Sequence, residues 1–242
     1  MQPPQKNKPD YGIDAPALAR NVILLVITGS VAGYFLHRYS NEAARILTSV
    51  LSILVQLGLC AIVLSLIYVK VEKFRHRDKM LNMLSWTGKE QVLDVGTGRG
   101  LLVIGAAKRL TSGKSFGIDI WNKGDLSNNS YEAAVRNAEL EGVKDKVEIK
   151  NADAQHLPFA DNTFDYVLSN LCLHNIYSKE GRAAVCREVI RVLKPGGSAL
   201  ISDFLHTKEY AETFTRHGLQ ATRCVSFLLA PFLLKIVKVQ KM

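Results

Sequence analysis

Cysteine is scarce in this chain of 242 residues, which contains only Cys60, Cys172, Cys186 and Cys224. No two of them have the spacing of a redox pair or of half a zinc site, and we predict no metal site. Scattered thiols are typical of a protein from a reducing compartment and argue against a disulfide-bonded secreted framework.

Acidic residues are also in the minority, with 22 Asp and Glu against 31 Lys and Arg, for a net charge of +9. The first 80 residues hold ten Lys and Arg against five Asp and Glu, an excess of five. Because this excess lies beside long apolar runs, it favours contact with a membrane surface over binding of nucleic acid.

Charge is missing altogether from two stretches. The run from Val22 to Leu36 has 15 residues, which is short for a hydrocarbon core of about 30 Å unless Leu18, Ala19 and a snorkelling Arg20 extend it. The run from Ile46 to Val69 has 24 uncharged residues and is long enough to span. We therefore predict a tail over residues 1–20 and a transmembrane hairpin over residues 21–70, with spans at about 18–38 and 46–69.

The flanking charges predict an orientation for the hairpin. The link from His37 to Arg45 carries two arginines, whereas Lys70 to Lys79 carries five basic residues. By the positive-inside tendency the link lies outside and both flanks lie in the cytoplasm. This predicts an integral membrane protein with a basic juxtamembrane linker at residues 71–78 and a cytoplasmic domain at residues 79–242. A cleaved signal peptide fits less well, because the first run starts late and a second follows it.

A glycine-rich turn follows a short apolar run at Val92–Val95. Gly96, Gly98 and Gly100 occupy alternate positions, and an apolar helix pattern begins at Leu101. Glycine permits positive φ and close approach of a ligand, and a helix start offers unpaired N–H groups. Asp94 precedes the turn, where a carboxylate repels a pyrophosphate and suits a cation. This argues against a nucleotide-dependent oxidoreductase.

Strand and helix patterns alternate after this turn, which predicts an α/β fold with helices on both faces of a mainly parallel sheet. Seven strands are expected. They are residues 91–95, 115–120, 146–150, 164–169, 198–203, 220–227 and 233–240.

The pattern Asp94-x-Gly96-x-Gly98-x-Gly100, together with later motifs, closely resembles class I S-adenosylmethionine-dependent methyltransferases, including small-molecule and quinone methyltransferases. The resemblance covers about residues 79–240. It implies a Rossmann-like seven-stranded sheet and S-adenosylmethionine as methyl donor. It also implies cofactor contacts from the first motif, with the acid at the amino-acid end of the cofactor. The residues concerned are Asp94, Gly96, Thr97, Gly98 and Gly100.

The same resemblance assigns roles to later residues. Asp119, at the end of the second predicted strand, corresponds to the acid that binds the ribose hydroxyls, with Ile120 beside it and Trp121 flanking the adenine. Asp153 and Ala154 correspond to the adenine site. The loop from Asn170 to Asn175 borders the methyl donor, and within it Asn170 and His174 are the candidate catalytic residues. His174 is either a general base or substrate orienter or a structural histidine. Tyr11 either caps the membrane entry or folds over the cofactor.

The expected function is methyl transfer from S-adenosylmethionine to a lipid or lipophilic small molecule at the bilayer, driven mainly by alignment of the reactants. Other readings stay open: an enzyme for a soluble metabolite that the hairpin only localises, or a non-catalytic cofactor-binding membrane scaffold. An arsenite methyltransferase needs converging thiols, and the surroundings of Cys172 and Cys224 do not match that family. The oligomeric state does not follow from the sequence.

Overall fold

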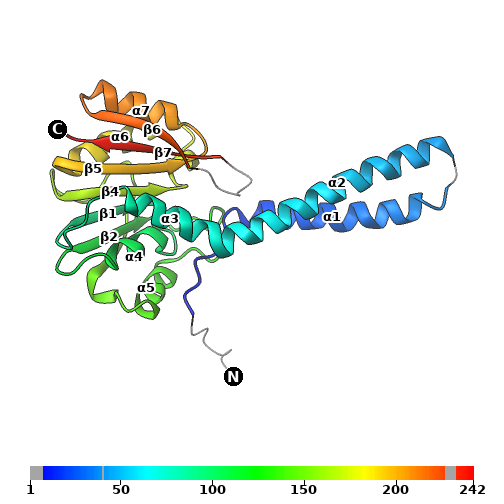
Figure 1. The fold of residues 1–242 in the computed structure, drawn as a ribbon, viewed down its shortest axis with the longest axis horizontal. Helices are drawn as coiled ribbons and strands as arrows, with labels where there is room; N and C mark the ends of the chain where they lie inside the picture. The colour runs from blue at the N-terminus through cyan, green and yellow to red at the C-terminus, as the bar shows by residue number, and fades with distance from the viewer. Residues whose placement is uncertain (1–7, 40, 227–232) are drawn as a thin grey trace.

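The computed structural model describes residues 8–39, 41–226 and 233–242. They form an α/β domain from which a long helical hairpin projects (Figure 1). Most of the apolar stretch at residues 227–234 falls on residues 227–232, which lie outside the described residues.

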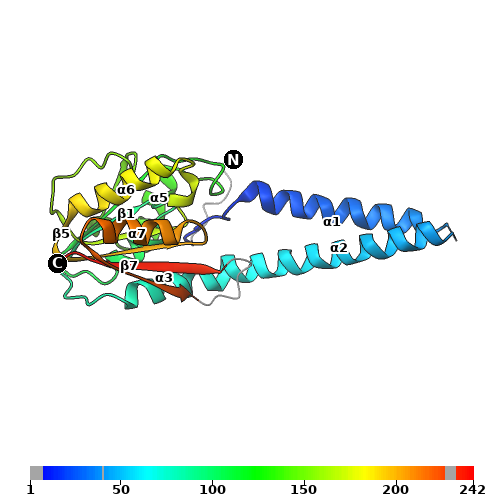
Figure 2. The same ribbon diagram turned by 90° about the horizontal axis from the view of Figure 1, so that it is seen from above.

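The hairpin consists of α1 (Pro16–Leu36) and α2 (Glu42–Ile67), which lie side by side in both views (Figures 1 and 2). Asn41 caps α2 by accepting a hydrogen bond from the backbone N–H of Ala44 at 2.7 Å. Gly58 permits close packing, because a Cβ there would lie 2.5 Å from Cγ2 of Val26 on α1. Both helices are long and apolar enough to cross a membrane, and only 0% and 6% of their most apolar windows are buried. They are therefore not core helices of the α/β domain.

The segment predicted as a basic juxtamembrane linker, residues 71–78, is helical. A π-helical turn η1 (Tyr68–Glu72) and α3 (Lys73–Asn82) continue α2, so that residues 42–82 form one helix of 41 residues. No glycine or proline occurs from residue 59 to residue 87, so nothing interrupts the helix. Within this stretch Lys73, His76 and Met80 lie about one turn apart and are buried against the domain.

The α/β domain contains one sheet of seven strands in the order β3-β2-β1-β4-β5-β7-β6, in which β1 to β5 are parallel and β7 is antiparallel to both neighbours. This confirms the predicted Rossmann-like fold class. The strands are β1 (Gln91–Val95), β2 (Lys114–Asp119), β3 (Val147–Asn151), β4 (Phe164–Asn170), β5 (Leu193–Asp203), β6 (Gln220–Ser226) and β7 (Leu234–Gln240). β5 begins five residues earlier than expected, since its pairing with β4 continues across a register shift between Phe164 and Tyr166.

Helices cover both faces of the sheet, because neighbouring strand residues point to opposite sides. Leu93 and Val167 face α6 (Lys179–Val192) and α7 (Thr207–Arg216) in one core. Val92 and Leu168 face α3 and α4 (Leu101–Ala107) in a second core. A third cluster packs α4 against α5 (Tyr131–Leu140). The 3₁₀ turns η2 (Lys144–Lys146) and η3 (Leu173–Asn175) complete the domain.

The hairpin projects from the edge at which the parallel strands end (Figure 1). Ligands of open α/β sheets bind outside the carboxyl ends of the strands. The fold therefore brings the base of the hairpin and the expected ligand site to the same edge.

Candidate functional site

The turn after β1 adopts a conformation that needs glycine. Gly96, Gly98 and Gly100 have φ of 73°, 52° and 90°. A Cβ on Gly96 would lie 2.2 Å from the Cys172 Sγ, so the loop after β4 closes directly over the turn. The N–H groups of Gly96 and Thr97 both donate to the carbonyl oxygen of Ile118 on β2 at 2.9 Å, which fixes the turn between the two strands.

Asp94 is 1% exposed, and only one of its two carboxylate oxygens has hydrogen-bond partners. Its Oδ2 accepts hydrogen bonds from Thr97 Oγ1 at 2.8 Å and from the Val103 N–H at 3.0 Å. Its Oδ1 is buried without a hydrogen-bond partner among the described residues. Burial raises the pKa of this carboxyl to about 7, against the two hydrogen bonds that lower it. A cationic ligand would supply the missing partner.

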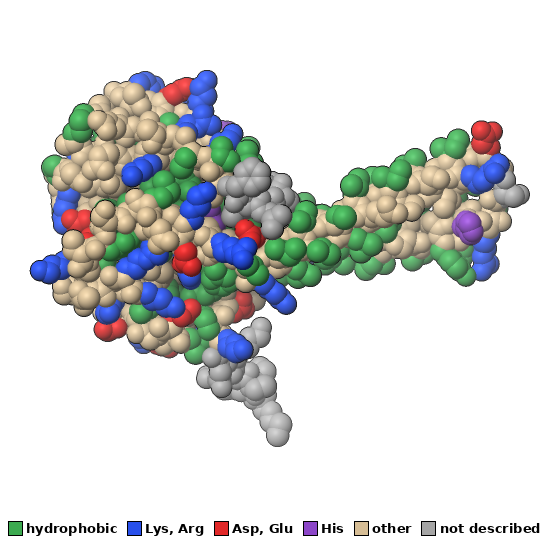
Figure 3. Space-filling view, in the orientation of Figure 1, with side chains coloured by type: hydrophobic (Ala, Val, Ile, Leu, Met, Phe, Trp, Pro, Cys, Tyr) green, Lys and Arg blue, Asp and Glu red, His purple; other side chains and the backbone are tan. Residues whose placement is uncertain are grey.

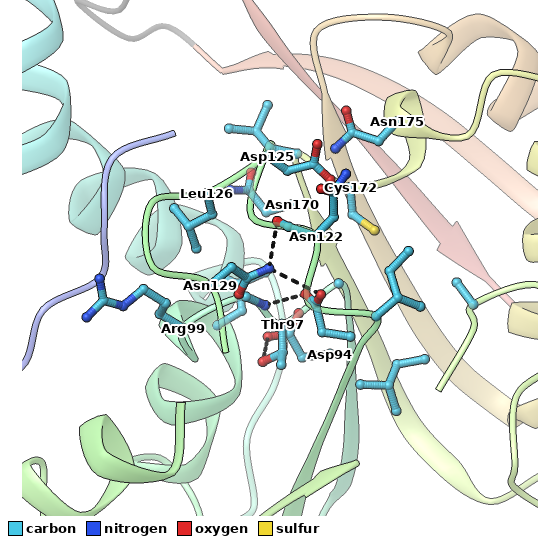
Figure 4. Close-up of a pocket in the computed structure, with 18 of the residues that line it drawn as sticks. Asp94, Thr97, Arg99, Asn122, Asp125, Leu126, Asn129, Asn170, Cys172 and Asn175 are labelled. Atoms are coloured by element: carbon cyan, nitrogen blue, oxygen red, sulfur yellow. Dashed lines mark hydrogen bonds between the residues drawn. The ribbon is translucent and has the colours of Figure 1, made fainter. Parts of the chain in front are cut away.

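Asp119 lies at the carboxyl end of β2 and is already engaged by the backbone. Its Oδ2 accepts from the Gly98 N–H at 2.8 Å, and its Oδ1 accepts from the Trp121 N–H at 2.7 Å and from Asn129 Nδ2 at 3.3 Å. Asn129 belongs to the segment between β2 and α5, which we call the insert. Figure 4 shows it reaching toward this strand end. Asn129 was not predicted as a site residue from the sequence, because no motif there indicates a contact with Asp119.

The residues after Asp119 differ in their relation to the cavity. Ile120 lines it and is 65% exposed. Trp121 has a φ of 63°, and its ring makes an edge contact with Tyr131 at 6.1 Å. Trp121 is not among the residues that line the cavity. The structure thus gives the Trp121 backbone, rather than its ring, a role in holding Asp119.

Asp153 and Ala154 follow β3 and line the same cavity. Asp153 Oδ1 accepts from the Gln155 N–H at 2.9 Å, which forms a local Asx turn. The turn orients the carboxylate at the side of the cavity that Asp119 also borders.

The loop after β4 forms the opposite wall. Asn170, Cys172 and Asn175 line the cavity (Figure 4), and the buried Asn170 Oδ1 has no hydrogen-bond partner among the described residues. Burial raises the pKa of the Cys172 thiol far above its usual range, and the carboxylates of Asp119, Asp203 and Asp94 add to the effect. The thiol therefore stays protonated, which disfavours thiolate chemistry here.

His174 lies against Asp203, a fully buried acid at the end of β5. His174 Nδ1 lies 2.8 Å from Asp203 Oδ1, and the His174 N–H donates to Oδ2 at 3.1 Å. The imidazole also lies 4.6 Å from the Phe204 ring, between centroids. His174 is not among the cavity-lining residues, whereas its neighbour Asn175 is. Sequence reasoning missed the role of Asp203, although an acid at a parallel strand end was an available signal.

The segment before α1 closes another side of the cavity; we call residues 10–15 the strap. It pairs with the insert after β2 through an antiparallel bridge between Asp14 and Leu126. Tyr11 is 6% exposed, lines the cavity and donates its hydroxyl to Glu141 at 2.9 Å. The side chain of Asn137, on α5, bonds both the N–H and the carbonyl of Asp10.

The cavity enclosed by these elements measures about 550 Å³, which suits a cofactor-sized ligand. Tyr68 and Lys73, from the helix that continues α2, also line it. The cavity therefore lies between the α/β domain and the base of the hairpin.

A turn that requires glycine, an acid with one unpaired buried oxygen and acids at two neighbouring strand ends define a cofactor-binding α/β domain. These residues suit a ligand that carries a cation and hydroxyl groups. S-adenosylmethionine fits these residues: the half-satisfied Asp94 suits its amino-acid end, and Asp119 suits its ribose. Among the described residues, no group of three or more His, Cys, Asp or Glu side chains forms a metal site.

Comparisons with known proteins agree. The family described as "Methyltransferase domain" matches residues 92–197. A Bacillus subtilis protein of solved structure superposes with a TM-score of 0.56 at 18% identity, covering 69% of this chain and 98% of its own. An S-adenosylmethionine-dependent methyltransferase from Methanosarcina mazei gives a TM-score of 0.56 at 20% identity, covering 68% and 97%. Residues 92–197 therefore match a methyltransferase domain, the solved structures share its fold, and the residues of the cavity fit S-adenosylmethionine as methyl donor.

Curated relatives match over part of their length. A ubiquinone/menaquinone biosynthesis C-methyltransferase from Vibrio cholerae is 32% identical over 115 residues, which cover 48% of this chain and 41% of that protein. A sterol 24-C-methyltransferase from Schizosaccharomyces pombe is 31% identical over 145 residues, covering 59% and 35%. The chain thus spans less than half the length of these relatives.

Proposed function

We propose that this protein is a membrane-anchored methyltransferase that transfers a methyl group from S-adenosylmethionine to a lipid or lipophilic small molecule on the cytoplasmic side of a membrane. One observation carries the proposal: Tyr68 and Lys73, which follow α2 directly, and Tyr11 and Asp14, which precede α1, all line the cofactor cavity. The residues that flank the hairpin helices then form part of the active site. An enzyme with a water-soluble acceptor would not need its active site built onto a membrane anchor.

The surface of the hairpin supports membrane insertion. Large apolar side chains such as Leu24, Ile53 and Leu57 are 51%, 57% and 62% exposed, and Figure 3 shows apolar side chains along its whole length. Exposed apolar surface costs about 25 cal/mol per Å² in water, so a bilayer is the environment that stabilises such a hairpin. Polar and charged residues gather at its tip (Figure 3), as expected outside the hydrocarbon core.

The chemistry follows from the residues around the cavity. When bound, S-adenosylmethionine supplies an activated methyl group on a sulfonium. Asp94 would pair with its ammonium, Asp119 would accept from its ribose hydroxyls, and Asp153 with the Ala154 N–H would hold its adenine. The strap and the loop after β4 exclude water and align the acceptor, and alignment of this kind lowers the barrier for a direct displacement.

A proton acceptor is available next to this wall. Asp203 Oδ1 lies 2.8 Å from Nδ1 of His174, and Nε2 of the imidazole would take a proton from an acceptor hydroxyl or amine. Asn170, with its unpaired buried Oδ1, would orient the acceptor. The relatives named for sterol and quinone methylation support a lipophilic acceptor, because sterols and quinones of this kind partition into membranes.

The test uses the full chain reconstituted into vesicles made from the lipid extract of its host, with methyl-labelled S-adenosylmethionine and the host's water-soluble metabolites. Label should enter the organic phase and should be absent with the Asp119→Ala variant, which loses the ribose contact. Label found only in water-soluble products would favour an enzyme that the hairpin merely localises. Tight cofactor binding without any labelled product would favour a non-catalytic scaffold.

A further inference from the structure

Large apolar side chains stand exposed at the carboxyl edge of the sheet, where a soluble domain usually places polar loops. Five of them form what we call the rim. They are Ile120, Tyr177, Leu205, Val225 and Leu233, which are 65%, 98%, 46%, 49% and 51% exposed.

The topology places the rim on one edge. Ile120 follows β2, Tyr177 follows β4 and η3, and Leu205 follows β5. Val225 lies at the end of β6 and Leu233 directly before β7, where the antiparallel hairpin turns at that same edge. The hairpin α1–α2 projects from this edge as well (Figures 1 and 2).

The hairpin is joined to the domain at both of its ends. On one side α2 continues through η1 into α3, which is buried in the domain. On the other side, the Ala15 N–H at the start of α1 donates to the Asp125 carbonyl oxygen at 2.9 Å. With both ends attached, a hairpin that crosses a bilayer holds the rim toward the membrane surface.

The charges around the rim suit an anionic surface. Arg20 on α1, Lys70 on η1 and Lys123 in the insert are exposed. All three lie on segments at the base of the hairpin, where headgroups would meet them.

Two rim residues, Ile120 and Tyr177, also line the cofactor cavity. Apolar side chains of the rim therefore border the cavity. We propose that the rim is a second membrane-contact surface, which dips into the headgroup region beside the hairpin and holds the cavity mouth there. An acceptor would then present its reactive group to the cavity while its apolar part stays in the bilayer. This inference rests on the proposed membrane anchoring.

The proposal is tested with tryptophan substitutions in the full chain, reconstituted into vesicles that contain brominated phospholipids. Leu205→Trp and Tyr177→Trp place the probe on the rim. Leu140→Trp is the matched control, because Leu140 is 40% exposed at the end of α5, near the opposite edge. The native Trp86 and Trp121 are present in every variant, so the parent protein supplies the background.

Both rim probes should lose fluorescence with bromines near the headgroups, whereas the Leu140→Trp probe should not. Quenching of the rim probes no greater than that of the control would overturn the proposal. So would rim fluorescence that changes with protein density in unbrominated vesicles, because a second copy would then cover the rim.

A second measurement separates this proposal from the proposed function. Leu205→Asp and Leu233→Asp alter rim residues that do not line the cavity. We expect them to slow methylation of the vesicle-embedded acceptor without changing cofactor affinity. Unquenched rim probes with intact lipid methylation would reject the rim and leave the proposed function standing. Quenched rim probes without lipid methylation would support the rim as a membrane contact and reject the proposed function.

Discussion

The ammonium of Lys73 donates a 2.7 Å hydrogen bond to the carbonyl oxygen of Gly12, across 61 positions of sequence. It also donates to the Tyr11 carbonyl at 3.1 Å and lies 3.6 Å from Asp14 Oδ2. Lys73 follows the hairpin and the strap precedes it, so this contact closes the hairpin into a loop at the cavity wall. Burial of the ammonium lowers the pKa of Lys73, whereas the nearby Asp14 carboxylate raises it.

Lys73→Met should release the strap. It removes hydrogen bonds from a charged donor that is 3% exposed and leaves Asp14 without its cation. We expect a loss of about 2–3 kcal/mol in stability and roughly tenfold weaker cofactor binding. Thermal unfolding in detergent measures the stability, and calorimetry in detergent measures the cofactor affinity. Lys79→Met, at an exposed position of the same helix, should change neither. Equal effects of the two variants would show that Lys73 has no special role.

Cofactor affinity should fall as the pH drops below 7. Without cofactor the pKa of Asp94 is about 7, because of burial, so the carboxyl is partly protonated near neutrality. The cofactor's ammonium favours the ionised form, so binding below pH 7 must displace a proton, at a cost approaching tenfold in affinity per pH unit. Calorimetry from pH 5.5 to 7 measures the slope. Asp94→Asn should bind weakly with a flat profile, and a flat profile in the parent protein would refute the role of Asp94.

His76 should destabilise the fold in acid. Its imidazole is 2% exposed, with its two nitrogens 3.0 Å from Ser226 Oγ and 2.6 Å from Ser202 Oγ. Burial lowers its pKa from 6.5 to about 4, so the unfolded state takes up the proton first. The contribution of neutral His76 to the free energy of unfolding is fully present above pH 6.5. It is lost as the pH falls toward 4, and the loss is roughly 3 kcal/mol in all.

The measurement for His76 is denaturant unfolding at pH 7.5 and pH 5, compared with His76→Gln. The glutamine keeps hydrogen-bonding capacity but does not titrate, so the parent protein should lose more stability in acid than the variant. Asp94 changes stability in the opposite direction, because its pKa is raised, but it does so in both proteins. Parallel pH profiles would show that His76 does not titrate in this range.

Asp203→Asn should slow methyl transfer by roughly 10- to 100-fold without weakening cofactor binding, if His174 takes a proton from the acceptor. The amide keeps the shape of the side chain but no longer stabilises a charged imidazole. His174→Gln should have a similar effect on kcat, and the double variant should be no slower than either single one. Unchanged kcat in both single variants would make His174 a structural residue.

Cysteine labelling tests the predicted topology. Ser40, in the link between the two helices, lies outside the described residues, whereas the neighbouring Tyr39 is 63% exposed. With Cys60 and Cys224 replaced by serine, Tyr39→Cys should react with an impermeant reagent from outside. Lys79→Cys should react only after permeabilisation. The opposite pattern would reverse the orientation of the hairpin and place the catalytic domain outside.

The fold was predictable because its signals are local. Apolar runs of strand length, the turn from Gly96 to Gly100 and the paired apolar spans each depend on neighbouring residues. The contacts that complete the site are not local. Lys73 and His76 lie in the stretch predicted as a basic juxtamembrane linker, and only their partners on the strap and on β5 and β6 explain why they are buried.

For the candidate site as well, local features could be predicted from the sequence and contacts between distant residues could not. Asp94 and Asp119 follow from the order of strands and turns, and both line the cavity. The support from Asn129 to Asp119, and from Asp203 to His174, depends on how loops from different strands meet. The ring of Trp121 was expected either beside the adenine or packed in the domain, and it makes an edge contact with Tyr131.

Surface dilution of the acceptor tests most directly whether the substrate comes from the bilayer. The acceptor identified by labelling is held at constant bulk concentration while inert phospholipid is added to the vesicles that contain the full chain. If the cavity is filled from the membrane, the methylation rate should fall in proportion to the mole fraction of acceptor in the bilayer. A rate that stays constant on dilution would mean that the acceptor reaches the cavity from water, and would contradict the account.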